Sequence, residues 1–134
     1  MNTRKLVEVD LSDNVYRAII NQEWFHNNVI LRSAFTLRKN ESYLSVDRLG
    51  ERHQNVIFTK YLKTFHHVYG AAFLKVSDCI DAGVKVYEIG KKGDKYYSGI
   101  FYPDEPDVMM SIADDLAESA MFAEINVGIT VIVK

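Results

Sequence analysis

The chain of 134 residues contains one cysteine, two prolines and seven glycines. A single cysteine, Cys79, excludes a disulfide within the chain and is typical of a reducing compartment, so we expect a cytoplasmic protein. Cys79 lies between Asp78 and Asp81. Because acidic neighbours raise the pKa of a thiol, this environment argues against a reactive thiolate. We expect Cys79 to be a packed structural residue.

The sequence also has little net charge and no long apolar run. Its formal net charge is −2, with 48% hydrophobic and 25% charged residues, which is typical of a globular protein. A basic domain is the usual electrostatic footprint of nucleic-acid or anionic-membrane binding, so we expect no membrane partner and disfavour nucleic acid without excluding it. No segment approaches the length of about 18 apolar residues that spans a bilayer, and residues 1–8 lack the apolar core of a signal peptide.

Proline is too rare to mark a linker. Pro103 and Pro106 bracket one loop, and the sequence contains no internal repeat or low-complexity tract. A chain of this length buries about two-thirds of its unfolded surface, so it can fold without disulfides or metal. We therefore expect residues 1–134 to form a single domain.

Hydrophobic periodicity and turn residues predict the secondary structure. We expect helices over 15–22, 51–65, 78–82 and 107–122, the first with a strand over 16–20 as its alternative. We expect strands over 29–37, 43–46, 69–76, 84–89, 95–102 and 125–133. The pairs 29–37 with 43–46 and 84–89 with 95–102 are predicted hairpins, and Gly83 is predicted to end the helical turn before it. This order indicates an α+β fold, a mostly antiparallel sheet with two main helices packed on it.

No motif typical of a metal or cofactor site is present. His66 and His67 are adjacent and point in different directions, and His53 has no partner at metal-ligand spacing, so we expect no metal. Residues 90–93 are rich in glycine and lysine but lack the Walker spacing and lead into a strand. We expect a solvated hairpin tip there, and no cofactor.

Four polar residues near predicted strands are candidates for ligand binding: Arg17, Ser45, Asp47 and Arg48. Planar guanidinium groups grip phosphates or carboxylates, and the Ser45 hydroxyl adds a further donor. The alternative is a structural network in which Asp47 pairs with an arginine, because ion-pair networks are common outside functional sites. The two interpretations differ in whether Arg17 and Arg48 point into one pocket.

Tyrosines concentrate on the second predicted hairpin, at Tyr87, Tyr96, Tyr97 and Tyr102. An aromatic platform on a basic sheet can stack nucleobases, but the interleaved basic and glycine residues of RNA-binding motifs are absent. Tyrosine is also enriched at protein interfaces. We therefore take these four residues as candidates for a protein-interaction surface.

Short motifs along the chain resemble a family of small, uncharacterised bacterial proteins. These motifs are Tyr16-Arg17-x-Ile19, Ser33-Ala34-Phe35, Leu44-Ser45-Val46-Asp47-Arg48 and Tyr69-Gly70-x-Ala72. The family has a histidine, an apolar residue and a glycine at a late position, where this chain has Tyr97-Ser98-Gly99-Ile100 and no histidine. The resemblance implies a bacterial protein and carries no activity.

A fainter similarity is to ADP-ribosyl transferase-like domains, which hold an arginine on an early strand, a serine on a later strand and a late catalytic glutamate. Arg17, Ser45 and either Glu118 or Glu124 match these positions, although the Ser-Thr-Ser and Glu-x-Glu signatures are missing.

Two functions remain open. The favoured hypothesis is a cytoplasmic interaction or accessory module that binds a protein partner or a second copy. The alternative is a small ligand-binding domain or enzyme for an anionic or nucleotide ligand.

Overall fold

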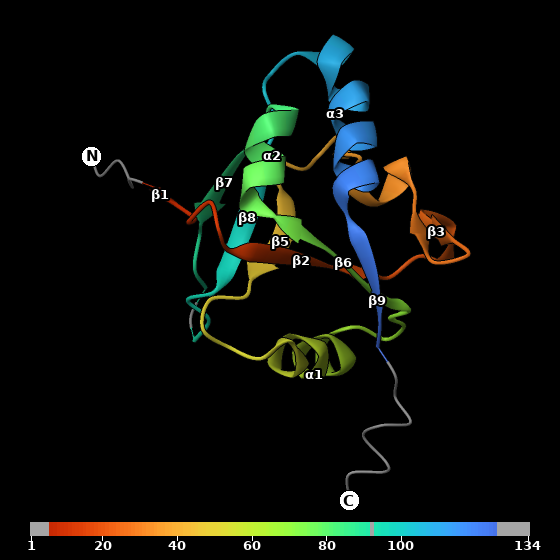
Figure 1. Ribbon diagram of the computed structural model, residues 1–134, viewed down its shortest axis with the longest axis vertical. Coiled ribbons are helices and arrows are strands. Elements are labelled where there is room, and N and C mark those ends of the chain that lie inside the picture. The colour runs from red at the N-terminus through yellow and green to blue at the C-terminus, as the bar shows by residue number, and fades with distance from the viewer. Residues whose placement is uncertain (1–5, 92, 126–134) are drawn as a thin grey trace, which may run out of the picture.

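The computed structural model describes residues 6–91 and 93–125. Its centre is a seven-stranded sheet in the order β1-β7-β8-β5-β2-β6-β9, in which every pair of neighbours is antiparallel (Figure 1). These strands are β1 (Val7–Glu8), β2 (Asn14–Ile19), β5 (Leu44–Arg48), β6 (Gly70–Lys75), β7 (Lys85–Glu88), β8 (Tyr97–Phe101) and β9 (Met121–Glu124). The α+β fold with a mostly antiparallel sheet is thereby confirmed.

Helices cover the two faces of the sheet. The helices α2 (Val76–Ala82) and α3 (Pro106–Ser119) lie on one side, and α1 (Gln54–Thr64) lies on the other (Figure 1). Each side has its own hydrophobic cluster, because successive strand residues point to opposite faces. In β2, Val15 and Ile19 belong to the larger cluster beneath α2 and α3, whereas Tyr16 belongs to the smaller cluster beneath α1.

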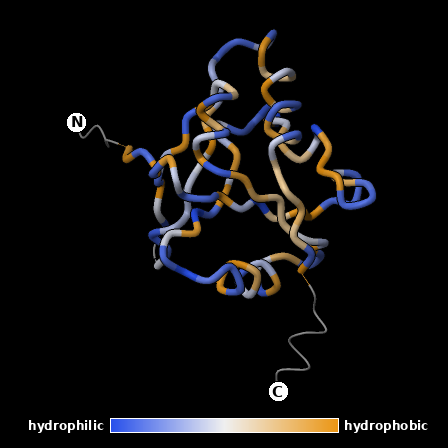
Figure 2. The backbone as a smooth tube through the Cα atoms, viewed as in Figure 1, coloured by the Kyte–Doolittle hydropathy of each residue, from blue (hydrophilic) through white to orange (hydrophobic). Residues whose placement is uncertain are grey.

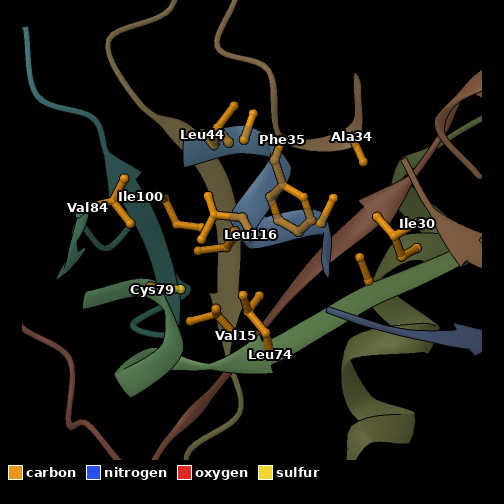
Figure 3. Packing of buried hydrophobic residues seen from close by; sticks show 14 of the residues in the cluster. Val15, Ile30, Ala34, Phe35, Leu44, Leu74, Cys79, Val84, Ile100 and Leu116 are labelled. Carbon is orange, nitrogen blue, oxygen red and sulfur yellow. The ribbon is translucent and has the colours of Figure 1, made fainter. Parts of the chain in front are cut away.

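The larger cluster forms the main core of the protein. Figure 3 shows Phe35, Leu44, Ile100 and Leu116 packed between the sheet and the helical layer, and all four are fully buried. The hydropathy of the chain follows this arrangement, with apolar stretches along the inner segments and polar stretches in the outer loops (Figure 2). None of the helices among the described residues is both long and apolar enough to cross a membrane.

Several local predictions are confirmed. The predicted helix over 51–65 is α1, and the predicted hairpin of 84–89 with 95–102 is formed by β7 and β8. Gly83 ends α2 in the left-handed conformation, with a φ of 106°. Helix α3 begins at Pro106, one residue before its predicted start, because the fixed φ of proline suits the first helical position and its missing N–H is not needed there.

The predicted helix over 15–22 is wrong, and its strand alternative is correct. Residues 14–19 form β2, which pairs with β6 along its whole length. Val15 and Ile19 are β-branched, and β2 is buried between strands on both sides, which suits a strand more than an exposed helix. Cross-strand pairing therefore outweighs the helical spacing of these apolar residues.

The predicted hairpin of 29–37 with 43–46 is also wrong. Strand β4 (Val29–Ile30) pairs instead with β3 (Phe25–His26), and the 3-10 helix η2 (Arg32–Phe35) follows. The two-residue turn between β3 and β4 is Asn27-Asn28, with φ values of 50° and 64°. Asparagine tolerates this left-handed conformation, which tight hairpins require at both central positions.

At the carboxyl end, β9 occupies residues for which the sequence predicts the last turn of a helix. Strand β9 pairs with β6, and α3 ends at Ser119. The predicted strand over 125–133 lies outside the described residues, except for Ile125, which is buried and follows β9.

Cys79 is completely buried in the main core on α2, and burial, assisted by the charge of Asp78, raises the pKa of its thiol to about 12. We expect the native protein at pH 8 to react with a disulfide reagent such as DTNB at least about a hundredfold more slowly than the urea-unfolded chain. The reagent reacts only with a thiolate that it can reach, and the buried thiol of Cys79 is neither ionised nor accessible. Absorbance at 412 nm measures the rate. Equal rates in the two states would show that Cys79 is accessible.

Candidate anion-binding site

The site forms where β2 and β5 separate. These strands pair only at Val15↔Arg48 and Tyr16↔Asp47, although β2 continues to Ile19 beside β6. The side chain of Arg17 occupies the gap that opens beyond this point. Its Nε donates to the backbone oxygen of Ala34 at 2.6 Å, and its Nη1 donates to that of Ser45 at 2.9 Å. These two carbonyls therefore fix the guanidinium in place.

A pocket of about 310 Å³ opens at this gap. Its cationic lining residues are Arg17, Arg38, Lys60 and Lys91, and its acidic ones are Glu41 and Asp47. Burial lowers the pKa of Arg17, with Glu41 opposing this effect, but an arginine remains charged at neutral pH. Cationic groups therefore outnumber carboxylates in the pocket by four to two.

Asp47 anchors the wall formed by α1. Only 5% of this residue is exposed, and its carboxylate accepts hydrogen bonds from Lys60 Nζ at 2.5 Å and from the Tyr61 hydroxyl at 2.8 Å. Lys60 also donates to Asp94 at 2.7 Å. Burial disfavours the charge of Lys60, but the bonds to the two carboxylates outweigh it and raise its pKa. Burial and the Asp47 charge raise the pKa of Tyr61, so its hydroxyl stays protonated.

Hydroxyl groups line the side of the pocket toward β8. The Tyr97 hydroxyl lies 2.8 Å from Ser45 Oγ and 3.2 Å from the Tyr43 hydroxyl. This hydrogen bond and partial burial raise the pKa of Tyr43 to about 12. The Tyr43 hydroxyl is therefore neutral at physiological pH, and hydroxyl groups such as those of Ser45 and Tyr97 can both donate and accept hydrogen bonds.

The cations around the pocket are held over aromatic rings. Arg17 and Arg38 both lie 5.3 Å from the centroid of Trp24. Lys60 and Lys91 lie 5.7 and 4.0 Å from that of Tyr97. Such contacts order a cationic side chain without neutralising its charge, so the groups remain available to an anion.

An open groove of about 1190 Å³ adjoins the pocket. Lys60 and Lys91 line both hollows, and the groove adds Arg52 and Lys95. Tyr96 also lines the groove, and the Arg52 guanidinium lies 3.6 Å from the centroid of its ring. The cationic surface thus continues from the pocket along α1 and the turn between β7 and β8.

The structure brings together three of the four ligand-binding candidates. Arg17, Ser45 and Asp47 all line the pocket. Arg48 does not, because adjacent strand residues point to opposite faces and Arg48 follows Asp47. Its Nε lies 3.2 Å from Glu88 Oε2 without hydrogen-bond geometry, and its guanidinium stacks over Tyr96 at 4.7 Å. The expected pairing of Asp47 with an arginine is wrong, since its partner is Lys60.

The four tyrosine candidates do not form one exposed patch. Tyr97 is buried in the pocket wall, and Tyr102 packs on the main core and donates its hydroxyl to the Phe35 carbonyl. Tyr96 lies beneath Arg48 and Arg52, and Tyr87 packs edge-on against Phe101. Each of the four occupies a different environment.

The glutamates expected from the ADP-ribosyl transferase resemblance are separate from Arg17 and Ser45. Glu118 lies on α3, which covers the opposite side of the sheet from α1, and Glu124 ends β9 at the edge. Neither is among the described residues that line the pocket.

Sequence reasoning missed Trp24, Arg38, Lys60, Tyr61 and Lys91 as pocket residues. The apolar stripe of α1 predicts that Tyr61 faces the sheet, but its contact with Asp47 depends on where α1 docks. Within residues 6–91 and 93–125, no three His, Cys, Asp or Glu side chains are grouped as metal ligands.

Comparisons of the chain with models of protein families, with curated proteins and with solved structures give no match. The function is therefore argued from the geometry and charge of the site.

Proposed function

We propose that this protein is a ligand-binding domain for small anions carrying phosphate or carboxylate groups, with the pocket at Arg17 as the binding site. The observation that carries the proposal is the orientation of Arg17. Its Nε and Nη1 donate to two backbone carbonyls, and Nη2 donates no hydrogen bond to any of the described residues. A guanidinium fixed on one side and open on the other is suited to receive an oxyanion.

The charges around Arg17 support the same ligand class. Asp47, the buried carboxylate of the pocket, is already matched by Lys60, so it adds little repulsion toward an incoming anion. Arg38 and Lys91 are exposed at the rim and have no carboxylate within ion-pair distance in the described part of the chain. A pocket with several convergent cations and partly apolar walls is typical of a small-molecule site.

The protein-interaction hypothesis remains a prediction, and the dispersed tyrosines offer it less support than the pocket offers ligand binding. A partner that presents a carboxylate or phosphate to Arg17 would unite the two hypotheses. Binding of the isolated anion is therefore the decisive measurement.

The test is a thermal-shift titration with pyrophosphate. A ligand at about 100 times its Kd stabilises the folded state by about 2.7 kcal/mol, which raises the Tm of a domain of this size by about 5–10 °C. We expect such a rise, and we expect the double variant Arg38→Gln/Lys91→Gln to reduce it at least about threefold. Both residues are exposed and each loses only one cation–π contact, with Trp24 or with Tyr97, so the variant should still fold.

The matched control is Lys63→Gln/Lys75→Gln, which removes the same charge from exposed positions outside the pocket. It should respond to pyrophosphate like the wild type. If both double variants lost the same part of the Tm rise, the rise would come from the overall charge of the protein and not from the pocket. If the wild type showed no rise in Tm at millimolar pyrophosphate, the proposal would be overturned.

A further inference from the structure

Half of one sheet face carries aromatic side chains that none of the helices in residues 6–91 and 93–125 covers. Tyr43 lies just before β5, Tyr87 lies on β7 and Phe101 lies on β8, all on the face to which α1 also packs. Helix α1 buries Tyr16 and Ala71, so it lies over β2 and β6 at the other half. The three aromatic residues belong to neither core cluster and are half-buried.

A glycine lets these rings lie close to the backbone of the sheet. A Cβ at Gly99 would stand 2.7 Å from Tyr43 Cδ1 and 2.7 Å from Ile89 Cδ1, so the Tyr43 side chain lies directly on the Gly99 backbone. The Phe101 ring follows at 5.1 Å from that of Tyr43, and Tyr87 follows at 5.3 Å from Phe101. The rings therefore form a continuous aromatic surface across β5, β8 and β7, hereafter the aromatic platform (Tyr43, Tyr87 and Phe101).

The aromatic platform adjoins the cationic pocket directly. Tyr97 links the two, because its hydroxyl contacts that of Tyr43 while its ring lies beneath Lys60 and Lys91. At the far end of the platform, the exposed Lys85 lies opposite Phe101 in the register. Cations thus border the platform at both ends, with the exposed Glu8, opposite Tyr87, as an acidic group at its edge.

Although the net charge is only −2, acidic and basic side chains are concentrated on opposite sides of the sheet. Helix α3 carries Asp107, Asp114, Asp115 and Glu118 at exposed positions on the opposite side of the sheet. On the α1 side, the pocket and groove have three carboxylates, Glu41, Asp47 and Asp94, against six cations. The cations are Arg17, Arg38, Arg52, Lys60, Lys91 and Lys95. A local potential of this kind attracts polyanions even when the whole chain is slightly acidic.

We propose that the aromatic platform and the neighbouring pocket bind single-stranded nucleic acid, with bases stacked on Tyr43 and Phe101 and phosphates at the pocket cations. The phosphate part of this inference rests on the proposed function. Bases stack on aromatic side chains regardless of sequence, and a cationic channel beside them follows the backbone. A double helix has no free base faces to offer, and a nucleotide monomer spans only part of the surface.

The test measures the fluorescence anisotropy of a labelled ten-nucleotide oligothymidylate at about 50 mM salt. We expect binding in the micromolar range, weakened about tenfold by Tyr43→Leu, since stacking contributes about 1–3 kcal/mol per base. Tyr43→Phe keeps the ring and should bind nearly as the wild type does. Tyr69→Leu, which removes a partly exposed aromatic residue near Phe25 instead, is the matched control.

Salt dependence tests the phosphate contacts independently. Lys91→Gln should lower the slope of log K against log salt by about 0.7, as expected for one lost phosphate contact on a single strand. Equal affinity for a ten-base-pair duplex, equal affinity for thymidine monophosphate, or equal losses in Tyr43→Leu and Tyr69→Leu would each overturn the inference. Pyrophosphate binding without oligonucleotide binding would overturn this inference alone, whereas loss of both would overturn the proposed function as well.

Discussion

Leu116→Ala should lower the free energy of unfolding by about 3–5 kcal/mol. Leu116 is fully buried in the last turn of α3, where its side chain packs with Phe35 and Ile100 in the main core (Figure 3). Alanine has a higher helix propensity than leucine, so the substitution does not weaken the helix itself. The loss of stability therefore comes from the apolar contacts of the leucine side chain and from the cavity that its removal leaves. Urea denaturation followed by circular dichroism measures it.

The matched control is Leu11→Ala, because Leu11 is 57% exposed in the loop before β2. We expect this control to change the free energy of unfolding by less than about 0.5 kcal/mol. A loss of stability is significant here because domains of this class have only about 5–15 kcal/mol in total. Similar losses for both leucines would contradict the assignment of the main core.

Asp47→Ala should lower the free energy of unfolding by about 2–4 kcal/mol. The substitution removes the acceptor for both Lys60 and Tyr61, and the Tyr61 hydroxyl is left in a buried position with only the Tyr16 carbonyl as partner. Deleting one partner of a buried pair is costly because the remaining polar groups lose their solvation without compensation. Asp94 still bonds Lys60, which limits the loss.

Asp114→Ala is the control for Asp47→Ala. Its ion pair with Arg32 spans 2.6 Å, but both side chains are about half exposed, at 49% and 48%. Exposed pairs contribute about 0–1 kcal/mol, so urea denaturation should separate the two variants clearly. If both variants lost the same stability, the Asp47 network would not be part of the folded core, and the wall of the pocket would lack its anchor.

The elements that the sequence predicts well are those that local interactions decide. Helix α1 and the β7–β8 hairpin follow from short-range periodicity and from turn residues that lie within the segment itself. The error at β2 has the opposite origin. Its six residues have apolar positions compatible with either period, and the choice depends on β5 and β6, which are distant in the sequence.

The β3–β4 hairpin was predictable in part. Asn27-Asn28 is a turn signal, since asparagine adopts positive φ more readily than other non-glycine residues. The sequence-based prediction missed this turn because it assigned residues 29–37 to one long strand that pairs with residues 43–46. Its apolar residues divide instead between β4 and the η2 helix, where Ala34 and Phe35 are buried against α3.

For the site, strand alternation decides which neighbours meet. Ser45 and Asp47 are two residues apart on β5 and face the pocket, while Arg48 turns to the other face and contacts Glu88. Arg17 follows the Tyr16↔Asp47 pair and reaches the pocket only because β2 and β5 separate at that point. The separation of two strands is a tertiary feature that residue types do not encode locally.

By itself, the sequence determined the α+β class, the α1 helix and the β7–β8 hairpin. Periodicity, turn chemistry and proximity along the chain are sufficient for these features. Only the tertiary structure decided that Lys60 and Lys91 complete the cationic pocket and that an aromatic platform adjoins it. These contacts join segments far apart in the chain, so they depend on how α1 and the strands pack around the sheet.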